Sequence, residues 1–150
     1  MIDMYCSHSN ATVPGSPTDI LALLTEPDAI ARWAPIPFEV MALDGRRLEA
    51  GSHARVAGRL AGRSVEFEVD VLRASREHLE LVARGPICID VNYRLRPSGS
   101  SSEIEASIGV EGRGLFSRML AKATEALLAG GALRMSLDRL GRELRPALAA

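Results

Sequence analysis

The chain has 150 residues, a formal net charge of −1 and a charged fraction of 25%, values that are typical of a soluble globular protein. Its length fits one domain, residues 1–150, that can bury about 70% of its unfolded surface. The balanced charge gives no basic excess for nucleic acid, and no apolar segment approaches the ~20 residues of a membrane span. Residues 1–4 lack the features of a secretory signal, and Cys6 and Cys88 form no CxxC motif. We therefore expect a cytoplasmic, reduced protein.

The N-terminal segment predicts a strand followed by two short helices. Residues 2–13 alternate loosely between apolar and polar side chains and end in a Pro-Gly turn. Ser16 is a suitable N-cap for the helix that follows, and Pro17 suits its first position. Pro27 ends this helix, and a second short helix is expected over residues 28–33. If Val13 faces inward, the odd-numbered side chains of the first strand do so too, but the sequence does not decide this.

From Phe38 to Glu111 the pattern of apolar residues changes to period two, which is typical of half-buried strands. Short turn-forming segments separate six such runs, so neighbouring strands are expected to be antiparallel. The expected strands are Phe38–Leu43, His53–Leu60, Ser64–Arg73, His78–Arg84, Ile87–Arg96 and Glu103–Glu111.

The side chains of two expected hairpins indicate how their strands pair. A turn at residues 61–62 places Arg55 opposite Glu68, and a turn at residues 99–100 places Arg94 opposite Glu105. The other faces then pair apolar residues, among them Val56 with Phe67, Ala54 with Val69, Ile89 with Val110, Val91 with Ile108, and Tyr93 with Ala106. A slip of one residue would destroy both patterns. The registers therefore predict a charged outer face and an apolar inner face, with odd-numbered side chains of 65–71 and 87–95 turned inward.

The last quarter of the chain, from Leu115 to about Leu148, predicts one long amphipathic helix. Its apolar residues recur at the three-and-four spacing that places them on one face. The Gly130-Gly131 pair is expected to bend this helix, either as a packing feature or as a device that widens a cavity. The absence of alternating strands and helices excludes a doubly wound parallel sheet, so the fold class is α+β.

Several segments match the patterns of one superfamily: Val13–Thr25, Ile30–Trp33, Ala50–Val56, Leu60–Arg63 and Glu111–Leu115. With the order of elements, they resemble the START-related superfamily, also called SRPBCC or Bet v 1-like, and in particular its bacterial polyketide cyclase/dehydrase branch. The resemblance implies a helix-grip fold, in which a curved antiparallel sheet of about seven strands wraps around the long C-terminal helix and leaves a cavity between them. Members bind polyketides, lipids or sterols; some catalyse cyclisation or dehydration, and others bind ligands or partner proteins.

The registers direct a mostly apolar set of side chains into that cavity, as is usual for sites that bind small organic molecules. From the sheet these are Val56, Phe67, Val69, Ile89, Val91 and Ile108, and from the helix Phe116, Met119, Leu120, Ala123 and Thr124. Trp33, the only tryptophan, is expected at the cavity mouth, as a ligand wall or as a packing anchor. Thr124 either positions a ligand or bonds back to its own helix.

Tyr93 is the candidate catalytic residue, because a phenol can donate a hydrogen bond to a developing enolate or carbonyl oxygen. The alternative is a core tyrosine that bonds to the backbone or to water. His53 is expected on the outer face beside Asp70. A surface ion pair is a simpler interpretation of these two residues than a catalytic dyad. The histidine spacing and the isolated cysteines predict no metal site. No cofactor is expected.

The first functional hypothesis is a protein that binds a hydrophobic polyketide, aromatic or lipid-like molecule and can cyclise or dehydrate it by general acid–base chemistry. The alternative is a non-catalytic carrier or an interaction module, and a homodimer or a protein partner stays open. In a third alternative the cavity is filled by its own side chains, and a volume below ~300 Å³ would favour it.

Overall fold

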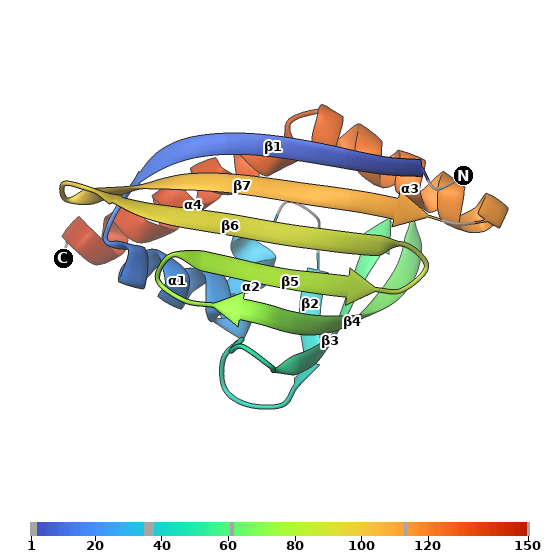
Figure 1. The fold of residues 1–150 in the computed structure, drawn as a ribbon, viewed down its shortest axis with the longest axis horizontal. Helices are drawn as coiled ribbons and strands as arrows, with labels where there is room; N and C mark the ends of the chain where they lie inside the picture. Colours follow the sequence, from blue (N-terminus) through green and yellow to red (C-terminus); the bar gives the residue numbers. More distant parts are fainter. Residues whose placement is uncertain (1–2, 35–37, 61, 113, 150) are drawn as a thin grey trace.

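A computed structural model describes residues 3–34, 38–60, 62–112 and 114–149, which form seven strands and four helices (Figure 1). The strands are β1 (Asp3–Pro14), β2 (Phe38–Leu43), β3 (His53–Leu60), β4 (Arg63–Ala74), β5 (His78–Arg84), β6 (Cys88–Ser98) and β7 (Ser101–Gly112). The helices are α1 (Pro17–Thr25), α2 (Pro27–Trp33), α3 (Gly114–Ala129) and α4 (Ala132–Ala149).

The strands form one antiparallel sheet in the order β1-β7-β6-β5-β4-β3-β2. Both registers expected from the side chains are confirmed: Arg55 pairs with Glu68 across β3 and β4, and Arg94 pairs with Glu105 across β6 and β7. Figure 1 shows the helices on one side of the sheet, with β1 at one edge and β2 curling round at the other. This is the helix-grip arrangement expected from the sequence.

The turn from β1 into α1 is fixed by a capping box. Asp19 donates its backbone N–H to the Ser16 hydroxyl over 3.2 Å, and Ser16 donates its own N–H to the Asp19 carboxylate over 3.1 Å. The neighbouring Gly15 donates to the carbonyl of Ser100 at the tip of the β6–β7 hairpin, and it accepts from the Ser102 hydroxyl at 2.8 Å. These bonds hold the start of α1 against that hairpin and so place α1 and α2 beneath the sheet.

The two faces of the sheet differ as the registers predict. Val65, Phe67, Val69 and Val71 on β4 are all buried, while the carboxylates between them lie on the outer face. The same alternation runs along β6, where Ile89, Tyr93 and Leu95 are buried and Asp90 is exposed. On β1, Val13 is buried and Tyr5, Ser7, Ser9 and Ala11 are half-buried. The odd-numbered side chains of this strand therefore also face inward.

The C-terminal segment is helical over the expected length, but it consists of two helices rather than one bent helix. α3 ends at Ala129 and α4 begins at Ala132, because Gly131 has a φ of +97°, a conformation that few residues other than glycine adopt. Gly130 donates to Ala126, and Gly131 donates to Leu128 in a final tight turn. α4 packs mainly against β1, and α3 against β7. Within the described residues, no helix is long and apolar enough to cross a membrane.

Candidate functional site: an apolar chamber between the sheet and the short helices

A partly enclosed chamber lies between the inner face of the sheet and the α1–α2 pair. Its volume is about 110 Å³. The residues that line it are Leu24, Ile30, Trp33, Ala34, Phe38, Val40, Leu48, Ala54, Val56, Val69, Leu79, Leu81, Ala83, Ile89, Val91, Tyr93 and Ile108. None of these residues carries a charge. The chamber can therefore exclude water from an apolar ligand but offers no ion-pairing partner.

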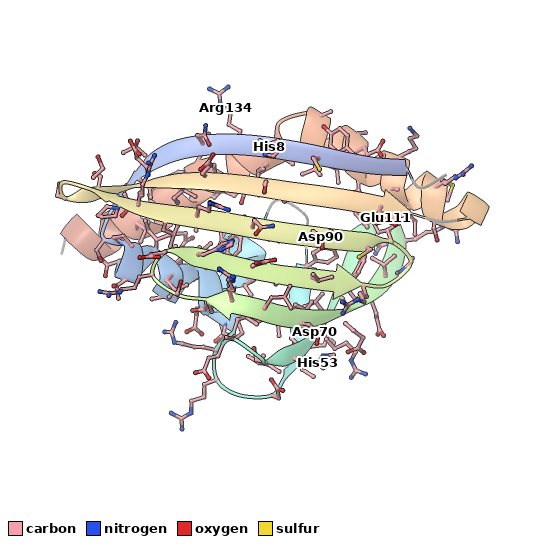
Figure 2. The ribbon with its side chains drawn as sticks, in the orientation of Figure 1. His8, His53, Asp70, Asp90, Glu111 and Arg134 are labelled. Atoms are coloured by element: carbon pink, nitrogen blue, oxygen red, sulfur yellow. The ribbon has the colours of Figure 1, made fainter. Side chains whose placement is uncertain are left out.

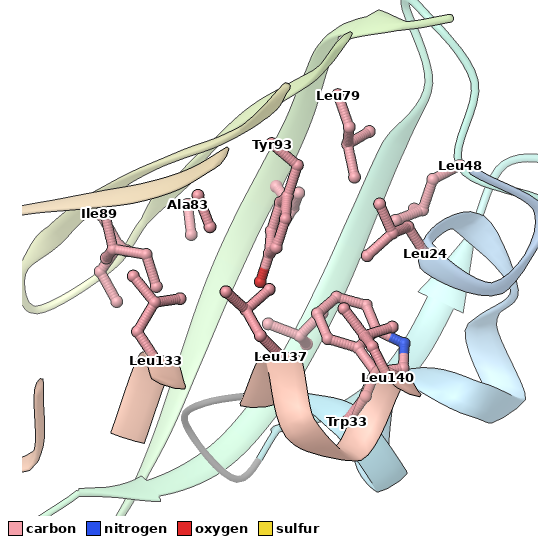
Figure 3. Packing of buried hydrophobic residues seen from close by; sticks show 14 of the residues in the cluster. Leu24, Trp33, Leu48, Leu79, Ala83, Ile89, Tyr93, Leu133, Leu137 and Leu140 are labelled. Atoms are coloured by element: carbon pink, nitrogen blue, oxygen red, sulfur yellow. The ribbon is translucent and has the colours of Figure 1, made fainter. Parts of the chain in front are cut away.

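Trp33 and Tyr93 meet inside this region (Figure 3). Their ring centroids lie 5.9 Å apart and their planes are 87° to each other, an edge-to-face arrangement that aromatic pairs favour. The Trp33 indole N–H donates to the carbonyl of Leu23 over 3.3 Å, which joins α2 to α1. The Ser136 hydroxyl of α4 donates to the carbonyl of Trp33 over 2.5 Å. Trp33 is thus held from two sides.

The Tyr93 hydroxyl is fully buried. The Ser136 hydroxyl lies close enough to act on it as a hydrogen-bonding neighbour, although the geometry is outside that of a regular hydrogen bond. Figure 3 shows the Tyr93 hydroxyl pointing away from the sheet towards Leu137 of α4. Burial raises the pKa of the Tyr93 phenol far above its usual range, and Ser136 offsets part of this effect. The phenol is therefore a neutral donor at physiological pH.

The structure brings together most of the sheet residues expected in the site. Trp33, Val56, Val69, Ile89, Val91, Tyr93 and Ile108 all line the chamber. Phe67 does not, because its ring packs edge-to-face on Phe38 at 5.2 Å and is buried in the core.

Of the helix residues expected in the site, those whose side chains the structure describes do not line the chamber. Met119 is 47% exposed and Ala123 is half-buried, since this stripe of α3 faces away from the sheet. Leu120 and Thr124 are fully buried but lie outside the chamber lining, and the Thr124 hydroxyl donates to the carbonyl of Leu120 over 2.9 Å. The Phe116 side chain lies outside the described part of the structure. The chamber is instead closed by α2, whose contribution beyond Trp33 the sequence did not reveal.

Sequence reasoning also missed the lining residues of β2, β5 and the segment before β3. Phe38 and Val40 alternate on β2, and Leu79, Leu81 and Ala83 alternate on β5. The alternation of these residues was visible in the sequence. The register of β4 with β5 was needed to show that they face inward. Leu48 precedes β3 in a connecting segment, and no periodicity marks it as buried.

A larger hollow, of about 1210 Å³, is an open polar groove on the outer face of the sheet. Two ion pairs lie in it: Arg96 is 3.1 Å from Glu103, and Arg73 is 3.9 Å from Glu80. His78 bonds to Asn92 over 2.8 Å. We base the candidate site on the smaller chamber, because enclosure and an apolar wall are what small organic ligands require.

His53 lies on the outer face of the sheet (Figure 2). A carboxylate lies within hydrogen-bond distance of each of its ring nitrogens. Its Nδ1 is 3.0 Å from Asp70 and its Nε2 is 2.5 Å from Glu68, while Arg84 lies 2.6 Å from Asp70. The carboxylates of Asp70 and then Glu68 accept hydrogen bonds from the imidazole and so raise the pKa of His53. Hydrogen bonds donated by His53 and by Arg84 lower the pKa of Asp70. This is a surface ion cluster on the opposite face of the sheet from the chamber, since the neighbouring residues Ala54 and Val69 line the chamber. Across the described residues, no group of three or more His, Cys, Asp or Glu side chains is arranged to hold a metal.

No protein-family model and no curated protein sequence matches the chain. Among solved structures it is similar to a START superfamily protein from Mycobacterium smegmatis, with a TM-score of 0.68 and 18% identity over 95% of this chain and 98% of the other. It is also similar to Ara h 8.0201, with a TM-score of 0.60 and 9% identity over 92% of this chain and 98% of the other. The chain has the START-related, Bet v 1-like fold.

A third structure with this START-like fold is DynU16, a protein in the dynemicin biosynthetic locus. Its TM-score is 0.62 at 18% identity, over 93% of this chain and 47% of the other. Identities this low establish the START-like architecture. The ligand must be argued from the chamber itself.

Proposed function

We propose that this protein binds a small hydrophobic molecule in the chamber beneath α2. The observation that carries the proposal is a partly enclosed chamber whose wall is made of uncharged, mostly apolar side chains. The START-like fold supports it, because the chamber lies between the sheet and the helices. Binding in such a place removes apolar ligand surface from water, at about 25 cal/mol per Å².

The volume limits what the closed chamber can hold. At about 110 Å³ it falls below the range of ~300–1,000 Å³ that is typical of sites for drug-sized ligands. A polyketide or a lipid would therefore require α2 to move. The volume also favours the alternative in which the cavity is simply part of the core, and absence of any binding would establish that alternative.

Non-catalytic binding is favoured over catalysis by the scarcity of titratable groups. Tyr93 is the only side chain of the lining that can titrate, and burial raises its pKa. A buried phenol of this kind can polarise a carbonyl by hydrogen bonding, but loss of its proton would leave a buried anion. Cyclisation or dehydration of a polyketide-like substrate, the second candidate, would rest on that polarisation alone. In that case Tyr93→Phe lowers kcat, whereas a carrier shows no turnover to lower.

Native mass spectrometry of the protein purified from its own host tests the proposal. We expect a fraction of the protein to retain a small molecule that organic solvent extracts. A stoichiometric protein partner without a small molecule would instead indicate an interaction module. Apo protein alone, together with no thermal shift in the presence of a panel of aromatic and acyl ligands, would contradict the proposal.

A cavity-filling variant locates the binding. Ala83 lines the chamber on β5, and Ala83→Leu adds three carbon atoms that the empty space can accommodate, so we expect the loss of binding with a stability change below about 1.5 kcal/mol. Ala126→Leu, on the exposed side of α3, is the matched control and should bind as wild type does. Trp33, the only tryptophan, reports binding by its fluorescence.

A further inference from the structure

We propose that two copies of this protein pair antiparallel through β1, edge to edge, and so form a dimer with one continuous sheet. β1 lies at one edge of the sheet, where β7 is its only strand neighbour among the described residues (Figure 1). Every second residue of an edge strand directs its backbone N–H and C=O groups away from the sheet, and such a row is a template for another strand. The proposal does not depend on ligand binding in the chamber.

β1 lacks four features by which edge strands commonly avoid pairing: a short length, a bulge, a proline within the strand and a charged side chain. It is 12 residues long, and its register with β7 runs without a shift from Asp3 to Pro14. Residues 4–13 include no proline and, with histidine counted as neutral, no charge. A long, regular and uncharged edge of this kind is an expected site of association.

β2, at the opposite edge of the sheet, has three of these features. It is only 6 residues long, its register with β3 shifts between Val40 and Ala42, and it carries the charged residue Glu39. Pairing of β1 with β2 of another copy would be heterologous and could continue into a filament, whereas β1 paired with β1 uses the same edge twice and closes as a dimer. The properties of the two edges therefore favour pairing of β1 with itself.

Symmetry limits the register of this pairing. A two-fold axis perpendicular to the sheet keeps the helices of both copies on one side, so residues of the outer face, which are even-numbered on β1, pair with one another. Centring the pairing on His8 aligns Asp3–Val13 of the two copies and leaves Pro14, which has no N–H to donate, outside the ladder. Centring on Ser9 would include Pro14, and centring on Ser7 would shorten the ladder. His8 should therefore face His8 of the second copy.

The inner side of β1 has room for a further strand. The inward residues of β7, which has a strand on each side, are at most 2% exposed, whereas the β1 residues opposite them are only half-buried: Tyr5 faces Val110, Ser7 faces Ile108, Ser9 faces Ala106 and Ala11 faces Ile104. In the proposed register Tyr5 lies beside Ala11 of the second copy, and Ser7 lies beside Ser9. These cross-strand pairs complete the burial that β7 already has.

Charge exchange at His8 tests both the edge and its register. His8 is exposed on the outer face, so His8→Glu and His8→Lys change the surface and not the core. In the proposed dimer each variant places two like charges directly opposite each other, and we expect it to dimerise about fivefold more weakly than wild type. In an equimolar mixture the two variants place opposite charges together, so mixed dimers should exceed half of all dimers. Native mass spectrometry measures this fraction once one variant is labelled with nitrogen-15.

Asn10 supplies the matched control. It is the next exposed residue of β1 on the outer face, and in this register it lies opposite Cys6 of the second copy. The two copies of residue 10 are then four positions apart along the ladder, about 14 Å, which exceeds the screening length of about 8 Å at physiological ionic strength. A mixture of Asn10→Glu and Asn10→Lys should therefore form mixed dimers at close to the random half.

Hydrogen exchange locates the contact on the backbone. The amides of residues 5–13 that point to the free edge should exchange more slowly where the dimer forms than after dilution to monomer, and the amides of β2 should not change. A protein that is monomeric at every concentration would overturn the proposal. So would a dimer in which charge exchange at residue 8 has no more effect than at residue 10, or a complex with a different protein in place of the homodimer.

Discussion

The Ser136 hydroxyl on α4 donates a 2.5 Å hydrogen bond to the carbonyl oxygen of Trp33, the last residue of α2. The two residues are far apart in the sequence, and this bond fastens the helix that covers the chamber to the C-terminal helix. Arg139 adds a second link to the next carbonyl, that of Ala34, over 3.3 Å, and Arg32 on α2 lies 3.2 Å from Glu143. The position of α2, and with it the chamber, therefore depends on α4.

Replacement of Ser136 by alanine should destabilise the protein by about 1–2 kcal/mol, because the buried Trp33 carbonyl loses its donor. Urea unfolding of the variant measures this difference. The amides of α2 should also exchange with solvent faster than in wild type, since the helix is less firmly attached. Ser107→Ala, on the outer face of β7, is the control and should change stability by less than about 0.5 kcal/mol. Equal effects of the two substitutions would contradict this role of Ser136.

The His53 cluster predicts a pH-dependent contribution to stability. Its carboxylate partners raise the folded-state pKa of His53 above the ordinary value of 6.5. The contribution is therefore fully present below pH 6.5, as long as Asp70 and Glu68 stay ionised, and is lost as the pH rises through the raised pKa. We expect the difference in thermal midpoint between wild type and His53→Gln to be larger at pH 6 than at pH 9. A difference that grows towards pH 9 would show that the ring does not carry the charge.

Asp70 contributes with the opposite sign. Because its pKa is lowered, first by His53 and then by Arg84, its contribution is present above its ordinary pKa and is lost as the pH falls through the lowered value. A pH titration of wild type and Asp70→Asn should show the midpoint difference shrinking below pH 4. A difference that is constant down to pH 2 would exclude an ionic contribution from Asp70.

Gly85, between β5 and β6, permits a close approach to the core. A Cβ at this position would lie 2.5 Å from the carbonyl oxygen of Glu66 and 2.8 Å from Cδ1 of Phe67, distances that force a shift of backbone or ring. Gly85→Ala should therefore cost about 1–3 kcal/mol or more in denaturant unfolding. Gly109 is the matched control, because a Cβ there meets nothing nearer than 3.8 Å. The steric account fails if Gly109→Ala is the more damaging of the two.

The break between α3 and α4 predicts unequal effects at the two glycines that form it. Gly131 has a φ of +97°, so Gly131→Ala should lose about 1–2 kcal/mol through backbone strain. Gly130 has no positive φ, and Gly130→Ala should cost clearly less. Thermal or urea unfolding of the two variants measures this difference in stability. If Gly131→Ala were stabilising, the segment would instead form one continuous helix.

The fold could be predicted from the sequence because each of its elements leaves a local pattern. Alternation with period two fixes which side chains face inward, and the charge pairs Arg55–Glu68 and Arg94–Glu105 fix the registers, both of which the structure confirms. Ser16 and Pro17 marked the start of α1 in the same local way. The glycine pair marked the position of the helix interruption, although not that the helix ends there.

The candidate site was less predictable, because its walls are set by tertiary packing. α3 carries two adjacent apolar stripes, and the pattern alone does not say which one faces the sheet. Leu120, Thr124 and Leu128 are buried, while Met119 and Leu127, one residue back, are exposed. The docking of α2 over the chamber depends on the bond from Ser136, across a separation of 103 residues, which no local pattern reveals.

A crystal structure of the protein soaked with a small apolar ring compound such as benzene tests the central claim, that the chamber binds a hydrophobic molecule, most directly. We predict electron density for one ring between Trp33, Leu79 and Val91, which line the chamber. A chamber occupied by its own side chains, or a ligand bound only on the outer face of the sheet, would contradict the account.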